Sequence, residues 1–143
     1  MIWFHSPSRA ILAVRLLLSA VFLFYGSVKL LGGQYHYGDW TISKSTADGT
    51  SLVWAFYGYS PFYGRVTGLF EFLPAVMLLF RRTTFLGAAA LFAVSLNITL
   101  MDFAFHYPFV KYLAATYTVL CAVLVLHDKP KLTAALHDPA ADA

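Results

Sequence analysis

The fold of this chain is decided by the stretch Ala10–Leu31, which reads AILAVRLLLSAVFLFYGSVKLL. Its only charged side chains are Arg15 and Lys29. A helix needs about 20 predominantly apolar residues to cross the hydrocarbon core of a bilayer. We therefore predict a membrane span that ends at Gly32-Gly33.

Three further apolar runs follow, at about 61–80, 84–106 and 108–127. The second begins with Ser60 as a candidate N-cap and Pro61 at the first helical position. The last two runs separate before Pro108, because the residue that precedes a proline leaves the helical region. We expect an antiparallel hairpin at this break, an outer loop over 32–59 and a flexible tail over 130–143.

The composition agrees with a membrane protein. Hydrophobic residues make up 59% of the 143 residues and charged residues 12%, whereas an average globular protein carries about 25% charge. A chain this small cannot bury so much apolar surface. The sequence predicts one integral membrane domain, an all-α four-helix bundle in a lipid bilayer, and no nucleic-acid partner. The single cysteine, Cys121, excludes an intrachain disulfide and is interpreted as a packing residue.

Lysine and arginine near the span ends predict the orientation, since cytoplasmic loops carry an excess of both. Lys44 lies in the long loop, with Lys29, Arg65 and Lys111 near the same boundary, whereas the opposite side carries Arg9, Arg81, Arg82, Lys129 and Lys131. We predict a multi-pass protein of a bacterial-type cytoplasmic (inner) membrane, with both termini in the cytoplasm.

Polar residues recur at helical spacing in the spans, so each span presents a polar or small-residue stripe. The first three stripes are Arg15, Ser19, Phe22, Gly26 and Lys29; Gly64, Gly68, Glu71 and Ala75; and Ser95, Thr99, Asp102 and His106. The last span has a weaker stripe of Lys111, Ala115, Thr118 and Ala122. Ionisable residues at membrane depth rarely face lipid, so the bundle interior is predicted to be polar. The Gly64-xxx-Gly68 face serves internal packing or a homodimer. Arg15 is interpreted as reaching the cytoplasmic headgroups.

Glu71 is the deepest acid and needs a cation or hydrogen-bond donors, for which Lys29 and Arg65 are the candidates. The predicted ligand-binding residues are Lys29, Arg65, Glu71, Asp102, His106 and Lys111, with Glu71, Asp102 and His106 as catalytic candidates. The alternative for Glu71 is a structural ion pair. Glu71, Asp102 and His106 could together form a metal site, but we predict no bound metal.

The outer loop is rich in aromatic residues, among them Tyr35, Trp40, Trp54 and Tyr57. Interfacial anchoring explains such a loop, because tryptophan and tyrosine favour the headgroup zone. The alternative is a lid over the outer mouth of the bundle, with residues 52–59 as a short interfacial helix.

Several of these motifs resemble the DoxX-like membrane proteins: the runs Phe24–Gln34 and Gly64–Glu71, the Arg81–Thr83 turn and the four-span layout. The resemblance extends over about residues 9–131. It implies that Lys29 and Glu71 correspond to the family's lysine and glutamate. It also implies a link to redox systems, since some members are subunits of a thiosulfate:quinone oxidoreductase and distant animal relatives are assembly factors.

Three hypotheses follow for the function. The first is an accessory or subunit of a membrane redox system that binds a lipophilic cofactor such as quinone in the polar interior, with a partner subunit as the electron source. The second is a non-enzymatic scaffold or assembly factor, whose outer aromatic loop binds another protein. The third is a carrier for a small lipophilic or anionic molecule.

Overall fold

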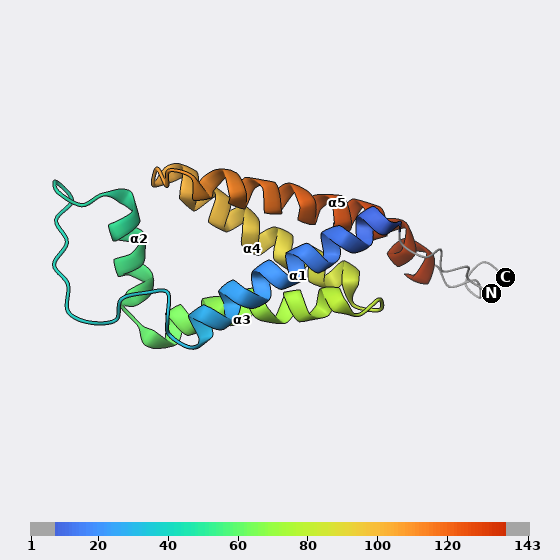
Figure 1. Ribbon diagram of the computed structural model, residues 1–143, viewed down its shortest axis with the longest axis horizontal. Coiled ribbons are helices and arrows are strands. Elements are labelled where there is room, and N and C mark those ends of the chain that lie inside the picture. The colour runs from blue at the N-terminus through green and yellow to red at the C-terminus, as the bar shows by residue number, and fades with distance from the viewer. Residues whose placement is uncertain (1–7, 137–143) are drawn as a thin grey trace.

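The computed structural model describes residues 8–136 and is helical throughout its regular elements (Figure 1). The helices are α1 (Arg9–Leu30), α2 (Gly49–Gly58), α3 (Pro61–Leu79), α4 (Thr84–Ala104) and α5 (Val110–Leu136). Within the described part, α1, α3, α4 and the Val110–Lys129 portion of α5 are long and apolar enough to cross a membrane. The prediction of an all-α, four-helix, multi-pass membrane protein is confirmed.

The ends of the helices follow the local sequence signals. The Ser60 hydroxyl accepts a hydrogen bond from the Tyr63 amide, and Pro61 opens α3. After α1, Gly32 has a φ of 79°, and the Gly32 and Gly33 amides donate back to the carbonyls of Lys29 and Val28. This is a Schellman motif, which glycine favours because it adopts positive φ without strain.

The end of α4 differs from the prediction, because the helix stops two residues early. His106 has a φ of 59°, its amide donates to the Phe103 carbonyl, and the Tyr107 amide donates to the Asp102 carbonyl. These contacts form a second Schellman motif, with histidine in the position usually taken by glycine. His106 is therefore a helix-terminating residue, and its side chain is exposed.

The first part of the predicted tail over 130–143 is helical. Helix α5 continues past Pro130 to Leu136, whereas residues 137–143 lie outside the described residues. A proline inside a helix removes one backbone hydrogen bond. The residues that follow, KLTAAL, include lysine, leucine and alanine, which are strong helix formers and allow the helix to resume.

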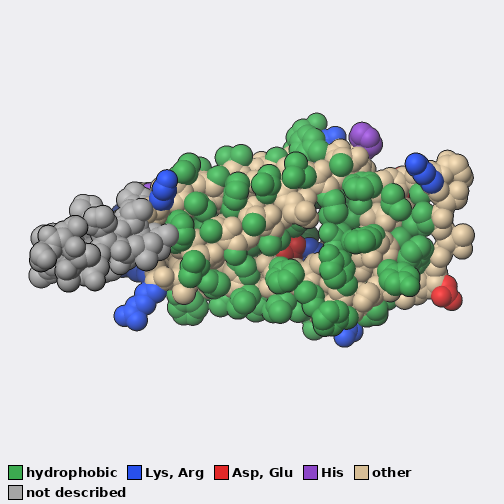
Figure 2. Space-filling view, turned by 180° about the vertical axis from the view of Figure 1, so that it is seen from behind, with side chains coloured by type: hydrophobic (Ala, Val, Ile, Leu, Met, Phe, Trp, Pro, Cys, Tyr) green, Lys and Arg blue, Asp and Glu red, His purple; other side chains and the backbone are tan. Residues whose placement is uncertain are grey.

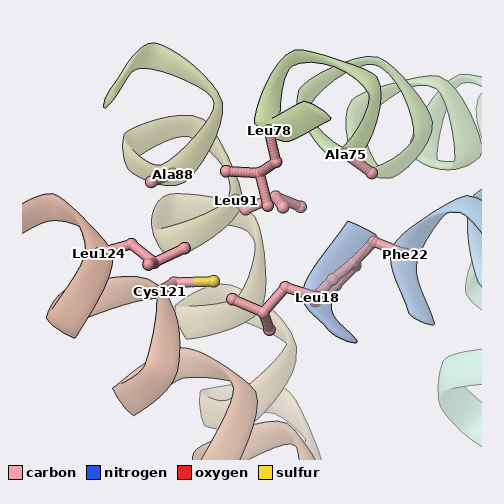
Figure 3. Close-up of a cluster of buried hydrophobic side chains, with 8 residues drawn as sticks. All are labelled: Leu18, Phe22, Ala75, Leu78, Ala88, Leu91, Cys121 and Leu124. Carbon is pink, nitrogen blue, oxygen red and sulfur yellow. The ribbon is translucent and has the colours of Figure 1, made fainter. Parts of the chain in front are cut away.

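The spans form two tightly packed pairs, α1 with α3 and α4 with α5, joined by contacts of α3 with α4 and fewer of α1 with α5. The pairs diverge toward the end that carries α2 (Figure 1). The opposite, narrower half holds the hydrophobic core (Figure 3), which consists of Leu18, Phe22, Ala75, Leu78, Ala88, Leu91, Cys121 and Leu124. Cys121 is fully buried in this cluster, as a packing residue would be.

Glycines allow α1 and α3 to approach closely. A Cβ on Gly68 would lie 2.7 Å from the Gly26 carbonyl oxygen, and a Cβ on Gly26 would lie 2.8 Å from the Phe72 amide nitrogen. A Cβ on Gly64 would lie 2.4 Å from the Tyr37 hydroxyl. The glycine face of α3 is therefore used for packing within this chain.

Arg15 does not reach outward, contrary to the prediction. Its side chain is buried, and its guanidinium donates to the Leu78 carbonyl oxygen from Nη2 at 2.6 Å and from Nε at 3.1 Å. The last carbonyls of a helix have no partner within that helix. Arg15 therefore caps the end of α3, and one turn along α1 Ser19 donates to the Ala75 carbonyl.

Candidate functional site

A buried ion pair lies where the two helix pairs diverge. The ammonium of Lys29, in the last turn of α1, donates to the Glu71 carboxylate of α3. The two residues are 6% and 2% exposed. Gly68, one turn before Glu71, makes this contact possible, because a Cβ there would lie 2.7 Å from the Lys29 Cβ. Lys29, one of the two candidate partners of Glu71, therefore forms the ion pair with it.

Asp102 adds a second buried acid from the opposite helix pair. It lies in the last turn of α4 and is 5% exposed. Its carboxylate interacts electrostatically with the Lys29 ammonium. Its Oδ2 atom, like the Oε2 atom of Glu71, is buried without a hydrogen-bond partner among the described residues. Such atoms are costly in an apolar interior unless a donor reaches them.

These three side chains line a cavity of about 440 Å³ between the diverging helices. Figure 2 shows acidic and basic side chains at the bottom of a hollow on this face, surrounded by hydrophobic ones. The walls are apolar and aromatic, and the aromatic side chains include Phe22, Tyr25, Tyr63, Phe70 and Tyr117. The volume and lining match those of small-molecule sites, which are mostly apolar with a few polar groups.

The cavity opens on the side of the bundle, between the membrane spans. Phe70 and Asn97, which line it from α3 and α4, are exposed on the surface of the bundle, as is Tyr25 on α1. The surrounding surface of the spans is apolar (Figure 2). A molecule dissolved in the bilayer can therefore enter sideways between helices.

The long first loop closes the wide end of the cavity. Helix α2 contributes Val53, Trp54 and Tyr57, and the segment before it contributes Gln34 and Tyr35. The loop is fixed by close contacts: a Cβ on Gly58 would lie 2.2 Å from the His36 carbonyl oxygen, and one on Gly49 would lie 2.1 Å from that of Phe105. This arrangement is compatible with the lid, the alternative to interfacial anchoring, and α2 starts three residues before the helix expected for it.

Tyrosines of the loop, of α2 and of the adjacent helices gather at this end of the cavity. Tyr35 stacks on Tyr57, with ring centroids 5.1 Å apart, and Tyr57 stacks on Tyr63 at 5.8 Å. Burial, with the nearby Glu71 carboxylate, raises the pKa of Tyr35 and of Tyr57. Burial and the Asp102 carboxylate raise the pKa of Tyr107 to about 12. These phenols are neutral hydrogen-bonding groups at physiological pH.

Three of the predicted site residues lie outside the cavity. Arg65 is exposed on α3, and His106 is exposed in the turn after α4. The Lys111 ammonium lies over the rings of Phe103 and Tyr112, 5.7 and 5.3 Å from their centroids. Among the residues that the structure describes, no three His, Cys, Asp or Glu side chains gather closely enough to hold a metal ion.

Most of the cavity residues that the sequence did not predict as site residues lie in the helices, and three lie in irregular segments. Gln34, Tyr35 and Tyr107 lie between helices, where no periodic pattern places a side chain on a face. The aromatic richness of residues 32–59 was a signal for Tyr35 alone among them. Asn97 of α4 also lines the cavity and is exposed.

The chain is similar to a protein of Bacillus subtilis (strain 168) over most of its length. It is 34% identical to uncharacterized protein YwoB over 117 residues, which cover 82% of this chain and 75% of YwoB. No family model matches the chain, and no solved structure matches it. The name of YwoB states no activity.

Proposed function

We propose that this chain, which belongs to the family of YwoB from Bacillus subtilis, binds a lipophilic molecule such as a quinone in the cavity beside Glu71. It would do so as an accessory or subunit of a membrane redox system. The observation that carries the proposal is a cavity of about 440 Å³ at the depth of the spans, into which two buried acids project unpartnered oxygens. An ion pair that served packing alone would need no such space beside it.

The lining suits a ligand with a polar ring and an apolar tail. The Lys29 ammonium and the tyrosine hydroxyls can donate hydrogen bonds to quinone oxygens, whereas Glu71 and Asp102 can accept them from hydroxyl groups. Aromatic walls favour a flat ring by stacking. The opening between helices would leave a tail in the lipid.

The redox part of the proposal needs a second protein. The single cysteine, Cys121, lies in the hydrophobic core and cannot form a disulfide within the chain. A partner subunit would therefore supply the electrons, and this chain would bind and position the quinone. The resemblance to DoxX-like proteins supports this role, since some of them belong to quinone-linked enzymes.

We also propose that the chain lies in a bacterial-type cytoplasmic membrane with α2 on the outer side. The helix ends far from α2 carry exposed Arg9, Arg81, Arg82 and Lys129. Cytoplasmic loops are enriched in lysine and arginine. The cavity would then lie in the outer half of the bundle.

A cavity-blocking variant tests the proposal. Ala93 lines the mouth of the cavity and is exposed, so Ala93→Trp should obstruct the opening without disturbing the buried core. Ala20→Trp, on an exposed position of α1 that does not line the cavity, is the matched control. Quinone binding to the full chain in lipid nanodiscs should be lost in the first variant and kept in the second. Absence of saturable quinone binding by the unaltered chain would reject the quinone proposal.

The scaffold hypothesis keeps one supporting observation. Phe56 and Tyr59, at the end of α2, are 61% and 80% exposed. Such side chains are available to a partner protein or to the headgroup zone. Substituting both with serine should disrupt a scaffold and leave quinone binding intact.

A further inference from the structure

The cavity is lined by more acidic than basic side chains. Among the described residues that line it, Lys29 is the one cation, and Glu71 and Asp102 are the two acids. Lys29 forms its ion pair with Glu71 and also interacts electrostatically with Asp102, so one cation faces two acids. Every other titratable lining group is a tyrosine: Tyr25, Tyr35, Tyr57, Tyr63, Tyr107 and Tyr117.

Neighbouring charges do not supply a second cation. Arg65 is exposed and does not line the cavity. Lys111 also lies outside it, over the rings of Phe103 and Tyr112. Asp102 is in the last turn of α4, where the helix carbonyls add partial negative charge. The C-terminal end of α4 therefore makes a positive charge beside Asp102 more favourable.

The walls of the same cavity suit a cation with an apolar body. Tyrosine and tryptophan faces attract cations by their quadrupoles, most strongly where water is excluded. Trp54, Tyr57 and Tyr107 bring such rings to the cavity from α2 and from the turn after α4. The unpartnered Oδ2 of Asp102 is a hydrogen-bond acceptor, which a protonated amine can satisfy while it balances the charge.

From this charge balance, the aromatic walls and the membrane depth of the cavity, we infer that the site takes lipophilic cations, namely protonated amines with an apolar or aromatic body. The inference rests on the proposed function in one respect, that the cavity is a ligand site. It differs from the proposed function in the chemistry of the ligand, whose headgroup is positively charged and contacts Asp102. A proton on Asp102 would compete with such a ligand, because it removes the charge that the ligand balances.

The experiment compares three probes with the same phenylbutyl body: protonated 4-phenylbutylamine, uncharged 4-phenylbutanol and anionic 4-phenylbutyrate. Binding to the full chain is measured calorimetrically in nanodiscs of uncharged phosphatidylcholine. At about pH 8 the amine should bind about tenfold more tightly than the alcohol, as one desolvated charge pair predicts. The anionic 4-phenylbutyrate should bind most weakly, and amine binding should weaken as the pH is lowered.

Three variants identify the residue responsible. Asp102→Asn should remove the preference for the amine, and Asp102→Glu should keep it. Asp39→Asn, which changes an exposed acid of the loop outside the cavity, is the matched control. Circular dichroism and gel filtration establish that each variant is folded. If Asp102→Asn does not fold, the pH series and the Asp102→Glu variant still decide the outcome.

Equal binding of amine and alcohol, or an amine preference that persists in folded Asp102→Asn, would overturn the inference. Quinone binding is measured on the same samples. Quinone binding without amine preference leaves the proposed function standing and rejects this inference. Amine binding without quinone binding supports the inference and rejects the redox ligand.

Discussion

Lys29 of α1 and Glu71 of α3, 42 residues apart in the sequence, form an ion pair buried in the bundle beside a cavity. Removing one member of such a pair leaves the other charge unpaired, which typically destabilises a protein by about 3–5 kcal/mol. Replacing both members removes the unpaired charge. We therefore expect substitution of both residues to destabilise the protein less than substitution of one of them.

We predict that Lys29→Met lowers the stability strongly, and that Lys29→Met combined with Glu71→Gln restores much of the loss. Thermal unfolding in detergent micelles, followed by circular dichroism, measures both. The exposed Lys44→Met is the control for loss of a positive charge. Equal destabilisation by the single and double variants would contradict the pairing.

Substituting Gly68 with alanine should separate α1 from α3. The added Cβ would lie 2.7 Å from the Gly26 carbonyl oxygen and from the Lys29 Cβ. Overpacking of this kind costs about 1–3 kcal/mol. Ala20→Val, on an exposed position of α1, adds volume without a clash and should leave the melting temperature nearly unchanged. A melting temperature of Gly68→Ala equal to that of the unaltered chain would show that the helices do not pack at this glycine.

Arg15→Leu should destabilise the narrow end of the bundle. The substitution removes both hydrogen bonds from the guanidinium to the Leu78 carbonyl. Hydrogen bonds to charged groups contribute about 1.5–3 kcal/mol. Arg9→Leu, at an exposed position at the start of the same helix, is the comparison. The same unfolding measurement should show a loss for Arg15→Leu that clearly exceeds the loss for Arg9→Leu.

Ionisation of Tyr107 should weaken the fold at alkaline pH. Burial raises its pKa from 10.0 to about 12, so the unfolded chain releases this proton at lower pH than the folded chain. The stability that it contributes is complete below pH 10 and is lost as the pH rises toward about 12. In Tyr107→Phe, stability measured across that interval should fall less steeply. Tyr59→Phe, at an exposed position, should leave the slope unchanged.

The proposed orientation predicts which cysteines a membrane-impermeant maleimide reaches. In a background with Cys121→Ala, Lys44→Cys should be labelled from outside intact cells, because it lies in the exposed loop before α2. Arg82→Cys, in the short turn between α3 and α4, should be labelled only after the membrane is opened. The reverse pattern would place α2 in the cytoplasm.

Local signals in the sequence predicted most of the secondary structure. Gly32, Ser60 and Pro61 end or begin helices where expected, because each acts through its own backbone or an adjacent amide. Signals that compete were harder to interpret. His106 ends α4 early by adopting a positive φ that glycine usually takes, and Pro130 does not stop α5.

The sequence by itself determined that the chain spans a membrane four times and that Lys29, Glu71 and Asp102 lie on inward-facing stripes. Hydropathy and helical spacing are properties of single segments, so no tertiary contact is needed to read them. The tertiary structure alone decided that Lys29 rather than Arg65 pairs with Glu71, and that Arg15 caps α3. It also decided that the helix pairs diverge and that the loop and α2 close the space between them. These outcomes depend on which helices are neighbours and how closely glycines let them approach, and such distances arise only when the segments pack together.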